Sequence, residues 1–390
     1  MEVKEEQKDI SIEELRGKID EIDRQLVDLF CKRMEVAAGV AEYKRQRGLP
    51  VLDSNRERQL LTKISALAGE EFGGYAKVLY TNMFSLSRSY QQGLINGQSP
   101  LCQSIKETIE ATPKLFPETA KVACQGIEGA YSQIATQKIF DLPEISYYRS
   151  FADVFDAVEK GECRYGVLPI ENSTAGSVTK IFDLILTHKF HIVKSYRLKV
   201  DHNLLVLPGT AIEDITDIYS HEQAINQCAG FLKNHPDIKV HVCANTAVAA
   251  KMVAELGKKE IAALSSRDCA LLYGLKNIAS SVQDMGNNYT RFICISKDPE
   301  IYPGADKTTI MAVTANTPGA LFNLLSHFFA HGINLTKLES RPIPDRDFEF
   351  MFYFDIDVSI YSPKYYTVIS ELEKICEDFR FLGSYSENVG

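Results

Sequence analysis

One long helical stripe near the amino terminus constrains the fold more than any other feature of the chain. Ser11 and Glu14 have the S-x-x-E spacing of a capping box, and no helix breaker follows before Gly48. Apolar residues recur between these limits with helical spacing, at Ile12, Leu15, Ile19, Ile22, Leu26, Leu29, Val36 and Val40. Further helices are predicted near Ser54–Ala68 and Tyr75–Gln92. Because such helices cannot bury their stripes alone, we expect an all-helical bundle, which a dimer would complete.

Two cations, Arg33 and Lys44, fall within the register of this stripe. They are eleven residues apart, about three helical turns, and therefore lie on one face. One interpretation is that both side chains extend out of the bundle into water. The other is a buried anion site, because a charge is kept inside a protein only when it is paired. Asp53, Arg56 and Glu57 follow the next loop, and each alone is typical of a helix start or a surface position.

The segment Arg16–Gln92 resembles the small all-helical chorismate mutases. The resemblance depends on separated polar positions with matching spacing, namely Arg16, Asp23, Arg33, Lys44, Asp53, Arg56, Glu57, Ser87 and Gln91. It implies that Arg16, Arg33, Asp53, Arg56 and Ser87 bind chorismate, with Arg16 and Arg33 holding its carboxylates.

The same resemblance implies roles at the reacting atoms. Lys44 and Gln91 would contact the ether oxygen of chorismate. Glu57, with Asp53 and Ser87 nearby, would hold the ring hydroxyl. The reaction is an intramolecular rearrangement that needs no nucleophile or cofactor, because holding the reactive conformer and stabilising charge on the breaking ether can supply the catalysis.

Arg16 and Arg33 are seventeen residues apart on one helix, about 25 Å at the helical rise. That distance is too long for both to bind one small ligand. If both serve one site, Arg16 must reach it from a second chain, so a homodimer or higher homo-oligomer is predicted.

Length and composition indicate a multidomain soluble chain. Its 390 residues suit two or three domains, with ordinary hydrophobic (45%) and charged (24%) content. A net charge of -9 argues against a general nucleic-acid or acidic-membrane binder. Nine cysteines without a C-x-x-C pair indicate reduced thiols rather than disulfides or a zinc site. The start lacks an apolar signal core and no apolar run is long enough to cross a bilayer, so a cytoplasmic protein is expected.

The pattern changes after the helical domain, which we place at residues 1–96. Residues 97–119 contain glycine, serine and several prolines, which predicts a linker. Between residues 120 and 298, short apolar strands alternate with helical stretches in two sets. This alternation predicts an α/β domain with a mostly parallel sheet in two lobes.

Polar residues gather where the predicted strands meet helices. These junctions are Gly129-Ala130-Tyr131-Ser132, Glu171-Asn172-Ser173-Thr174, Ser220-His221-Glu222-Gln223, Asn245-Thr246-Ala247 and Ser265-Ser266-Arg267. Each one alone is typical of a helix N-cap. Together, at the carboxyl edge of a sheet, they predict a crevice lined by hydroxyls, amides and helix N-termini, which favour anions. A small, polar substrate that bears a carboxylate suits such a crevice.

Other kinds of site have little support in the sequence. Gly126-x-x-Gly129 lacks the full G-x-G-x-x-G set, and there is no Walker loop, so dinucleotide and nucleotide binding are not expected. His188-x-x-His191 has no nearby acidic or cysteine partner, which favours ordinary histidines over a metal site. No local context suggests a Ser-His-Asp or Cys-His set. We therefore predict neither a metal nor a cofactor.

A loop of glycine and asparagine, Gly286-Asn287-Asn288, leads into Tyr289-Thr290-Arg291-Phe292 and then into an apolar strand. A hydroxyl, a guanidinium and an aromatic ring are thus neighbours at a strand end, where α/β proteins place their chemistry. Two interpretations of Arg291 are open: a clamp for a substrate carboxylate, or an ion pair that ties the strand to a lobe.

The region from about Lys121 to Ser296 closely resembles prephenate dehydratase. The matching motifs are Gly129-Ala130-Tyr131-Ser132, Pro169-Ile170-Glu171-Asn172-Ser173, Ser220-His221-x-Gln223-Ala224-x-x-Gln227-Cys228, Asn245-Thr246-Ala247 and Asn288-x-Thr290-Arg291-Phe292. The resemblance implies that prephenate loses CO2 and water to give phenylpyruvate, with Thr290 as the proton donor. A threonine hydroxyl is a poor acid, so a hydrogen-bond chain or another proton source must assist.

The same resemblance assigns prephenate binding to Ser132, Glu171, Asn172, Ser173, Ser220, Gln227, Thr246, Arg291 and Phe292. The role of Glu171 stays open, because it could act on the proton or orient Asn172.

The last part of the chain, residues 306–386, predicts the βαββαβ order of a ferredoxin-like domain. Asn316-Thr317-Pro318-Gly319-Ala320-Leu321 and Leu338-Glu339-Ser340-Arg341-Pro342 resemble the ACT-type regulatory domain of prephenate dehydratases. The resemblance implies that phenylalanine binds between two such domains and stabilises a less active arrangement. The residues involved would be Gly319, Ala320, Leu321, Glu339, Ser340, Arg341 and Pro342. The alternative is a dimerisation module without a ligand.

Taken together, the sequence predicts a bifunctional enzyme of phenylalanine biosynthesis, an isomerase and a lyase, which phenylalanine inhibits. Two alternatives are open. One is a dehydratase whose helical part only dimerises. The other is a non-catalytic sensor of an amino acid or carboxylate, since two-lobed α/β clefts also serve binding proteins.

Overall fold

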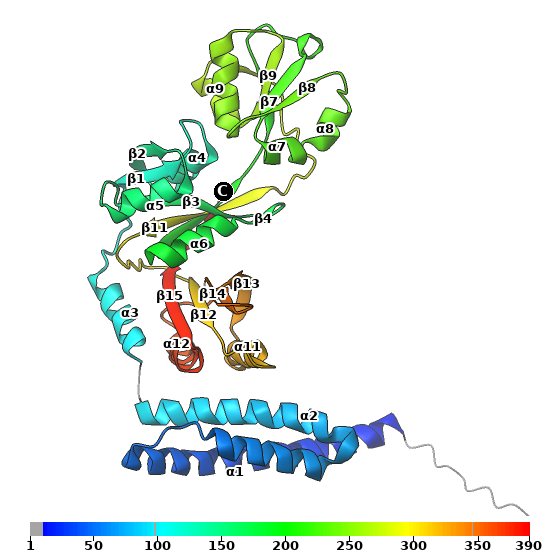
Figure 1. The fold of residues 1–390 in the computed structure, drawn as a ribbon, viewed down its shortest axis with the longest axis vertical. Coiled ribbons are helices and arrows are strands. Elements are labelled where there is room, and N and C mark those ends of the chain that lie inside the picture. The colour runs from blue at the N-terminus through cyan, green and yellow to red at the C-terminus, as the bar shows by residue number, and fades with distance from the viewer. Residues whose placement is uncertain (1–10, 97–98, 345) are drawn as a thin grey trace, which may run out of the picture. The chain divides into compact units, whose positions relative to one another are not determined.

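The computed structural model describes residues 11–96, 99–344 and 346–390 (Figure 1). The chain forms two compact units. Unit 1 contains residues up to Gln103 together with Thr314–Gly332 and Tyr366–Glu377. Unit 2 contains Ser104–Val313, Ile333–Tyr365 and Asp378–Gly390.

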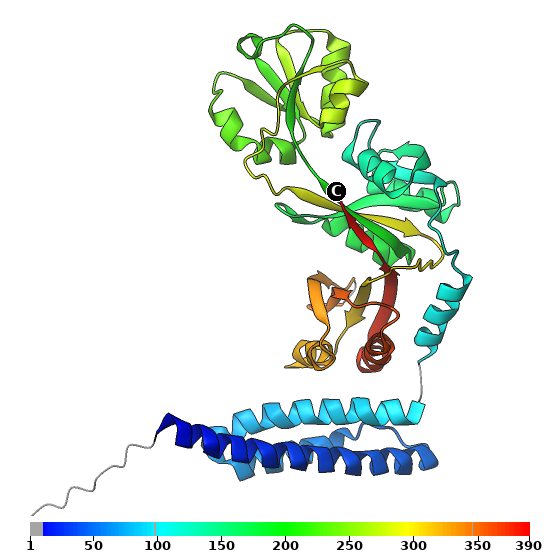
Figure 2. The same cartoon turned by 180° about the vertical axis from the view of Figure 1, so that it is seen from behind.

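Unit 1 is built on two long helices, α1 (Ile12–Arg47) and α2 (Ser54–Asn96), which lie side by side (Figures 1 and 2). The predicted start of α1 is confirmed, because the Ser11 side chain accepts a hydrogen bond from the backbone N–H of Glu14 at 3.2 Å. Within α2, Gly69 has φ 74° and ψ -179°, which interrupts the helical backbone. The two helices predicted after α1 therefore correspond to the two parts of α2. Unit 1 also contains α11 (Ala320–Ala330) and most of α12 (Pro363–Ile375).

The apolar stripe of α1 is exposed in the single chain. Its two buried residues are Ala37 and Ala41. Large apolar side chains remain open to solvent, among them Ile19 (56%), Leu29 (61%) and Val36 (69%). An unpartnered stripe of this length is what the sequence predicts for a helix that needs a second chain.

The predicted linker contains a helix that the sequence analysis missed, α3 (Pro100–Ala111). Pro100 occupies the first helical position, where its missing N–H is harmless. The hydroxyl of Ser99 accepts a hydrogen bond from the Cys102 N–H at 3.1 Å, as an N-cap does. The prolines therefore mark the start of a helix as well as a break between domains. Residues 97 and 98 lie outside the described part of the chain.

The first sheet of unit 2 has the strand order β16-β5-β11-β3-β1-β2, with β4 paired to β3. Its strands are β1 (Thr119–Gln125), β2 (Leu142–Tyr148), β3 (Tyr165–Asn172), β4 (Gly176–Ser177), β5 (His191–Lys199), β11 (Tyr289–Ser296) and β16 (Glu387–Val389). Strands β1, β2 and β3 are parallel, whereas β11 is antiparallel to both β3 and β5. Strands β1, β2, β3, β5 and β16 therefore run in one direction, and β11 and the short β4 run against them, so the prediction of a mostly parallel sheet is confirmed.

Helices cover both faces of this sheet. They are α4 (Tyr131–Ile139), α5 (Phe151–Glu159) and α6 (Thr179–His188). Neighbouring residues on a strand point to opposite faces, so Val167 packs in the core beneath α4 while Leu168 packs in the core with α5 and α6. Because both faces of the sheet are covered, the alternation of side chains along β3 and β11 determines which of them are available at the edge of the sheet.

The second lobe of unit 2 has its own sheet, in the order β10-β6-β9-β7-β8. Its strands are β6 (Asn203–Val206), β7 (Asp217–Ser220), β8 (Lys239–Val242), β9 (Ile261–Ser265) and β10 (Lys276–Ala279). The helices are η1 (Ile212–Asp214), α7 (Glu222–Gln227), α8 (Ala229–Lys233), α9 (Thr246–Leu256) and α10 (Arg267–Leu272). The predicted two-lobed α/β architecture is confirmed.

Two segments connect the lobes, residues 200–202 after β5 and residues 280–288 before β11 (Figures 1 and 2). They are hydrogen-bonded to each other, from Val200 N to Asn288 O at 2.8 Å and from Val282 N to His202 O at 2.8 Å. Because the chain leaves the first lobe along β5 and returns along β11, β11 runs antiparallel to both of its neighbours, β3 and β5.

The third sheet has the order β13-β14-β12-β15, and all its pairs are antiparallel. Its strands are β12 (Lys307–Val313), β13 (Asn334–Pro342), β14 (Phe350–Asp357) and β15 (Asp378–Tyr385). With α11 and α12 between them in the chain, they give the predicted βαββαβ order. Among the described residues, no helix is both long and apolar enough to span a membrane.

Candidate active site

A cavity of about 580 Å³ lies between the two lobes of unit 2. The first lobe contributes the ends of β3 and β11 and the start of α4, and the second lobe contributes the starts of α7 and α9. Predicted residues that line it are Ser132, Asn172, Gln227, Thr246, Thr290 and Phe292. Four of the five predicted strand–helix junctions reach the cavity, and Ser265-Ser266-Arg267 does not.

Asn172 and Thr290 lie directly opposite each other on β3 and β11. The Asn172 amide donates from Nδ2 to Thr290 Oγ1 at 2.9 Å and to Asn288 Oδ1 at 2.8 Å. Because the threonine oxygen accepts this bond, its own proton is left to donate elsewhere. Among the described residues none accepts that proton. The arrangement presents a hydroxyl donor to the cavity.

A chain of hydrogen bonds holds the Asn172 amide in this orientation. Its Oδ1 accepts from the Thr174 hydroxyl at 2.7 Å. That hydroxyl accepts from Gln227 Nε2 at 2.8 Å. Gln227 Oε1 in turn lies 2.9 Å from both His202 Nε2 and Asn288 Nδ2, which donate to it. The amide flips of Asn172 and Gln227 are therefore fixed by a continuous network between the lobes.

His202 is a lining residue that the sequence analysis missed. It lies three residues after the end of β5 and just before β6, and burial lowers its pKa, which favours the neutral ring. Its Nδ1 is buried and has no hydrogen-bond partner among the described residues. A single histidine after a strand carries no local signal, which explains why it was missed.

Helix starts supply further polar groups to the cavity. The Asn245 side chain accepts from the Val248 N–H at 2.8 Å and caps α9, so Thr246 stands in the first turn. His221 caps α7 by accepting from the Gln223 N–H at 3.3 Å. The N-terminal N–H groups of α4 and α9 favour a bound anion. Lys180, the second missed residue, is the one lining side chain with a permanent charge among the described residues.

Arg291 does not lie with this group. On β11 it points to the face opposite Thr290, and its side chain is 9% exposed. It pairs with Asp355, and its Nε lies 2.7 Å from a carboxylate oxygen of Glu387. The structure therefore contradicts the carboxylate clamp and matches the alternative, an ion pair that ties the strand to its neighbours.

Three other predicted prephenate contacts also lie outside the cavity. Glu171 directly precedes Asn172 on β3, so its side chain lies on the opposite face, where it pairs with Lys337 at 2.8 Å. The Ser173 hydroxyl donates to the Asn287 carbonyl at 2.8 Å. The Ser220 hydroxyl is fully buried and donates to the Leu264 carbonyl at 2.7 Å. These hydroxyls stabilise the strand ends rather than a ligand.

The second set of predicted site residues lies on α1 and α2. Ser87 and Gln91 are buried, and Gln91 Nε2 donates to Ser87 Oγ at 3.2 Å. Arg33 lies over the Phe84 ring, with its guanidinium carbon 5.6 Å from the ring centroid. Lys44 is partly buried and donates to the Val51 carbonyl.

Two of these side chains each have a polar atom with an unsatisfied hydrogen-bonding capacity. Arg33 Nη1 and Gln91 Oε1 are buried without a hydrogen-bond partner among the described residues. Buried polar groups are nearly always satisfied, so unpaired ones indicate a place for a polar ligand. Of the two interpretations of Arg33, the structure supports the anion site.

The remaining residues of the set are more exposed. Glu57 pairs with Arg88 of α2, and Asp53 accepts from the Arg56 N–H at 2.9 Å. Arg16 is exposed in the first turns of α1. A single chain thus does not bring Arg16 to the other residues, as the helical spacing predicted.

Comparison with known proteins identifies a family for each of the two regions that contain these residues. A family model for prephenate dehydratase matches residues 122–300, and one for chorismate mutase type II matches residues 15–92. The bifunctional chorismate mutase/prephenate dehydratase of Escherichia coli (strain K12) is 33% identical over 386 residues, 96% of each chain. The chain belongs to this bifunctional family.

Two solved structures resemble part of the chain, and each match covers 68% of it. The prephenate dehydratase of Arthrobacter aurescens in complex with L-Phe is 28% identical, with a TM-score of 0.62 and 90% of that chain covered. GqqA, described as a novel type of quorum quenching acylase, is 32% identical, with a TM-score of 0.63 and 97% covered. These two structures are named for different activities although both resemble this chain. The fold alone therefore does not identify the reaction, which depends on the residues of the site.

The predicted regulatory residues lie in both units. Gly319 precedes α11 with φ 85°, a left-handed conformation that favours glycine. On β13, Glu339 accepts from the Ser177 hydroxyl at 2.6 Å, and Arg341 pairs with Asp183 of α6 at 2.9 Å. The second motif therefore contacts the dehydratase lobe directly.

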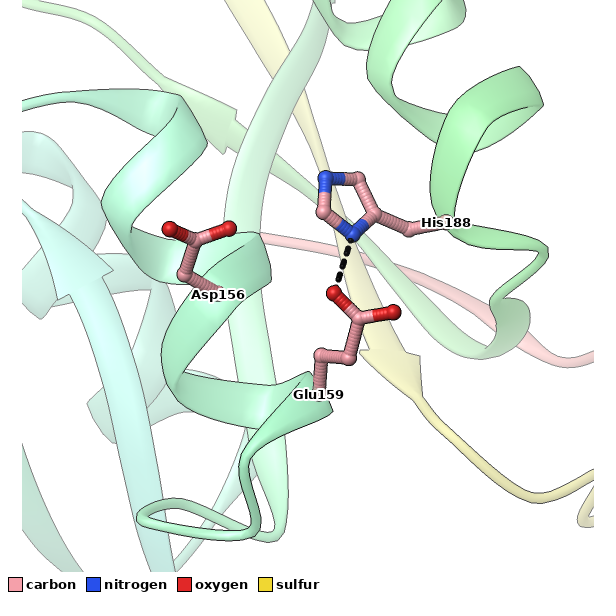
Figure 3. A group of neighbouring side chains, drawn as sticks. All are labelled: Asp156, Glu159 and His188. Carbon is pink, nitrogen blue, oxygen red and sulfur yellow. Dashed lines mark hydrogen bonds and ion pairs between the residues drawn. The ribbon is translucent and has the colours of Figure 1, made fainter.

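One cluster of possible metal ligands lies away from the dehydratase cavity. Asp156 and Glu159 of α5 and His188 of α6 each place a possible ligand atom within 4.8 Å of the others (Figure 3). The fold thus gives His188 the acidic neighbours that it lacks in sequence. His188 Nδ1 lies 2.9 Å from Glu159, and Lys160 lies 3.8 Å from Asp156. These ion pairs account for the cluster without a metal.

Proposed function

We propose that this chain carries out two successive reactions: chorismate to prephenate on helices α1 and α2, and prephenate to phenylpyruvate in the cavity of unit 2. One observation carries the dehydratase half of the proposal. Asn172 at the end of β3 and Thr290 at the start of β11 are hydrogen-bonded to each other, and both line that cavity. Membership of the bifunctional family supports both halves.

Dehydration in the cavity needs a proton for the leaving hydroxyl and a fixed position for the ring. The Thr290 hydroxyl is the donor, because its oxygen already accepts from Asn172 and its proton is left for the substrate. Loss of CO2 and water makes the ring aromatic, which supplies the driving force. The prephenate carboxylates are held by Lys180, by Thr246 and by the N-terminal N–H groups of α4 and α9.

The mutase half needs charge at the breaking ether oxygen and a held conformer. Lys44 and Gln91 supply the ether contacts, and the unpaired Arg33 Nη1 is left for a substrate carboxylate. Arg16 completes the site from a second chain, so the working form is a homodimer or a higher homo-oligomer. The exposed stripe of α1 supports this arrangement.

The C-terminal module is an ACT-type domain that binds phenylalanine. Its sheet order is that of ferredoxin-like domains. A relative of 28% identity is described in complex with L-Phe, which supports the same ligand here. Phenylalanine then inhibits by favouring a less active arrangement. We place the enzyme in the cytoplasm, as its composition predicts.

Purified full-length chain should consume chorismate and prephenate and form phenylpyruvate, each followed by ultraviolet absorbance. Phenylpyruvate formation from prephenate alone, without mutase turnover, would leave only the dehydratase. Binding of prephenate without any product would support the sensor instead. Phenylalanine should lower dehydratase turnover and raise the melting temperature; absence of both effects would remove the regulatory role.

A further inference from the structure

The strand pair β3–β11 has two functional faces. Asn172 and Thr290 are opposite each other and face the cavity, whereas the next pair, Glu171 and Arg291, is opposite on the other face. Side chains alternate strictly along a strand, so a rotation that moves one pair moves the other. Groups that hold Glu171 and Arg291 therefore also set the orientation of the hydroxyl and amide in the cavity.

Arg291 is held by residues of three separate strands, β14, β15 and β16. It pairs with Asp355 of β14, donates from Nη2 to Tyr385 Oη at 2.6 Å, and lies 2.7 Å from Glu387 of β16. Asp355 and Glu387 are 5% and 7% exposed, so these charges are almost fully removed from water. A buried charge of this kind is strongly destabilising when its partner is removed.

Glu171 is held by two ion pairs, a longer one with Arg291 at 3.9 Å and a shorter one with a lysine. Lys337 of β13, 9% exposed, lies with Nζ 2.8 Å from Glu171 Oε1 and donates to Ser177 Oγ at 2.7 Å. Ser177 is the residue that pairs with Glu171 in the β3–β4 ladder and lines the cavity. One ammonium group thus joins two strands that border the cavity to a strand of the third sheet.

The position of Lys337 connects two parts of the protein. It directly precedes the Leu338–Pro342 motif on β13. Glu339 of that motif accepts from the Ser177 hydroxyl at 2.6 Å, so Lys337 and Glu339 are both hydrogen-bonded to Ser177. A structural change in the Leu338–Pro342 motif would therefore be transmitted to Glu171 through the side chain of Lys337.

We propose that Lys337 and Glu171 form a positioning pair for the dehydratase reaction, which sets the orientation of Asn172 and Thr290 from the back of the strands. Glu171 acts through this pair and does not transfer the proton. The inference rests on the proposed dehydratase activity of the cavity. Small shifts of a reacting group are costly, so the pair affects turnover more than substrate binding.

The test uses the full-length chain with Lys337→Met, Glu171→Gln and the double variant, and measures kcat and KM for prephenate. Each single change should lower dehydratase kcat about tenfold with little change in KM. The double variant should lose no more kcat than Glu171→Gln alone, because that change already removes the contact with Lys337 together with the 3.9 Å ion pair between Glu171 and Arg291. Lys337→Arg should restore kcat to within about threefold of the unmodified chain.

Asp183→Asn is the matched control. It breaks the ion pair between Asp183 of α6, which is 57% exposed, and Arg341 of the same strand as Lys337, and it leaves the Lys337–Glu171 pair intact. Dehydratase kcat should stay within about twofold of the unmodified chain. Mutase turnover of each preparation reports correct folding, and if Lys337→Met does not fold, Glu171→Gln carries the test because Glu171 is 35% exposed.

Two results would overturn the proposal. If Glu171→Gln lowers kcat far more than Lys337→Met and the losses multiply in the double variant, Glu171 takes part in the chemistry. If both single variants keep normal kcat, the pair is only a structural contact. Failure of the unmodified chain to form phenylpyruvate would instead refute the proposed function itself, so the two failures are distinguishable.

Discussion

Asn172 Nδ2 lies 2.9 Å from Thr290 Oγ1 across the β3–β11 ladder, and the amide is the donor in this hydrogen bond. The direction of the bond decides what the threonine can do. An oxygen that accepts from the protein keeps its proton for a ligand, and the network through Thr174 and Gln227 prevents the amide from turning over. The poor acidity of threonine is thus countered by orientation, because the donor is already aimed before the substrate arrives.

Replacement of Thr290 by alanine should abolish most dehydratase turnover. Removing a positioned proton donor costs roughly a hundredfold or more in kcat. Thr290→Ser keeps the hydroxyl and the bond from Asn172, so it should retain activity within about tenfold. Phenylpyruvate formation measures both variants, and mutase turnover is the internal control. Equal turnover by Thr290→Ala and the unmodified chain would show that the donor is another group.

Lys180 should determine the affinity for prephenate rather than its rate of conversion. It carries the one permanent charge among the described cavity residues, and the substrate is an anion. Lys180→Gln should raise KM about tenfold, near 1.4 kcal/mol, with a smaller effect on kcat. Lys180→Arg should stay close to the unmodified chain, and the difference should shrink as salt rises.

The control for this prediction is Lys233→Gln. Lys233 is exposed on α8 and does not line the cavity. Lys233→Gln changes the net charge of the chain by the same amount as Lys180→Gln, so a general electrostatic effect on KM would appear in both variants. A fall in kcat without a change in KM for Lys180→Gln would contradict the binding role.

Much of the cavity could be predicted from the sequence, because its motifs lie at strand ends. Asn172, Thr246 and Thr290 were assigned through the resemblance, and the fold places them together. Arg291 was misassigned because neighbours in a motif were treated as neighbours in space. On a strand, adjacent side chains point to opposite faces, so Thr290 and Arg291 cannot share a ligand.

The rest depended on contacts between distant parts of the chain. Asp355 and Glu387, the partners of Arg291, lie 64 or more residues away in the sequence, where no local pattern links them to β11. The antiparallel direction of β11 follows from its return out of the second lobe. The α3 helix was missed because proline was taken as a break, although Pro100 suits a first helical position.

A complementation experiment should show that Arg16 acts across a dimer. Arg16→Ala and Lys44→Ala should each abolish most mutase turnover, because each removes a charge from the site. In a mixed dimer, one site takes Lys44 from one chain and Arg16 from the other, and that site is intact. Refolding an equal mixture should therefore restore roughly one quarter of the mutase activity, since half of the dimers are mixed and each has one good site. No recovery after mixing would show that Arg16 acts within its own chain or not at all.

Glu371 should make the stability of unit 1 sensitive to acid. This α12 carboxylate lies 2.9 Å from Nδ1 of His327 on α11 and 3.0 Å from Nε2 of His331, the residue that follows α11, and its side chain is 16% exposed. Burial alone would raise its pKa, but the hydrogen bonds from the two histidines lower the pKa from 4.5 to about 2. A folded-state pKa below the unfolded value stabilises the protein above pH 4.5, and this contribution is lost as pH falls from 4.5 towards 2.

Glu371→Gln should therefore destabilise the chain by about 3 kcal/mol near neutral pH and by almost nothing near pH 2. Urea unfolding followed by far-ultraviolet circular dichroism measures the difference at several pH values. Glu70→Gln, at an exposed position of α2, is the control and should shift the midpoint little at any pH. If the difference between Glu371→Gln and the unmodified chain stays constant from pH 7 to pH 2, the histidine contacts do not hold the carboxylate in its charged form.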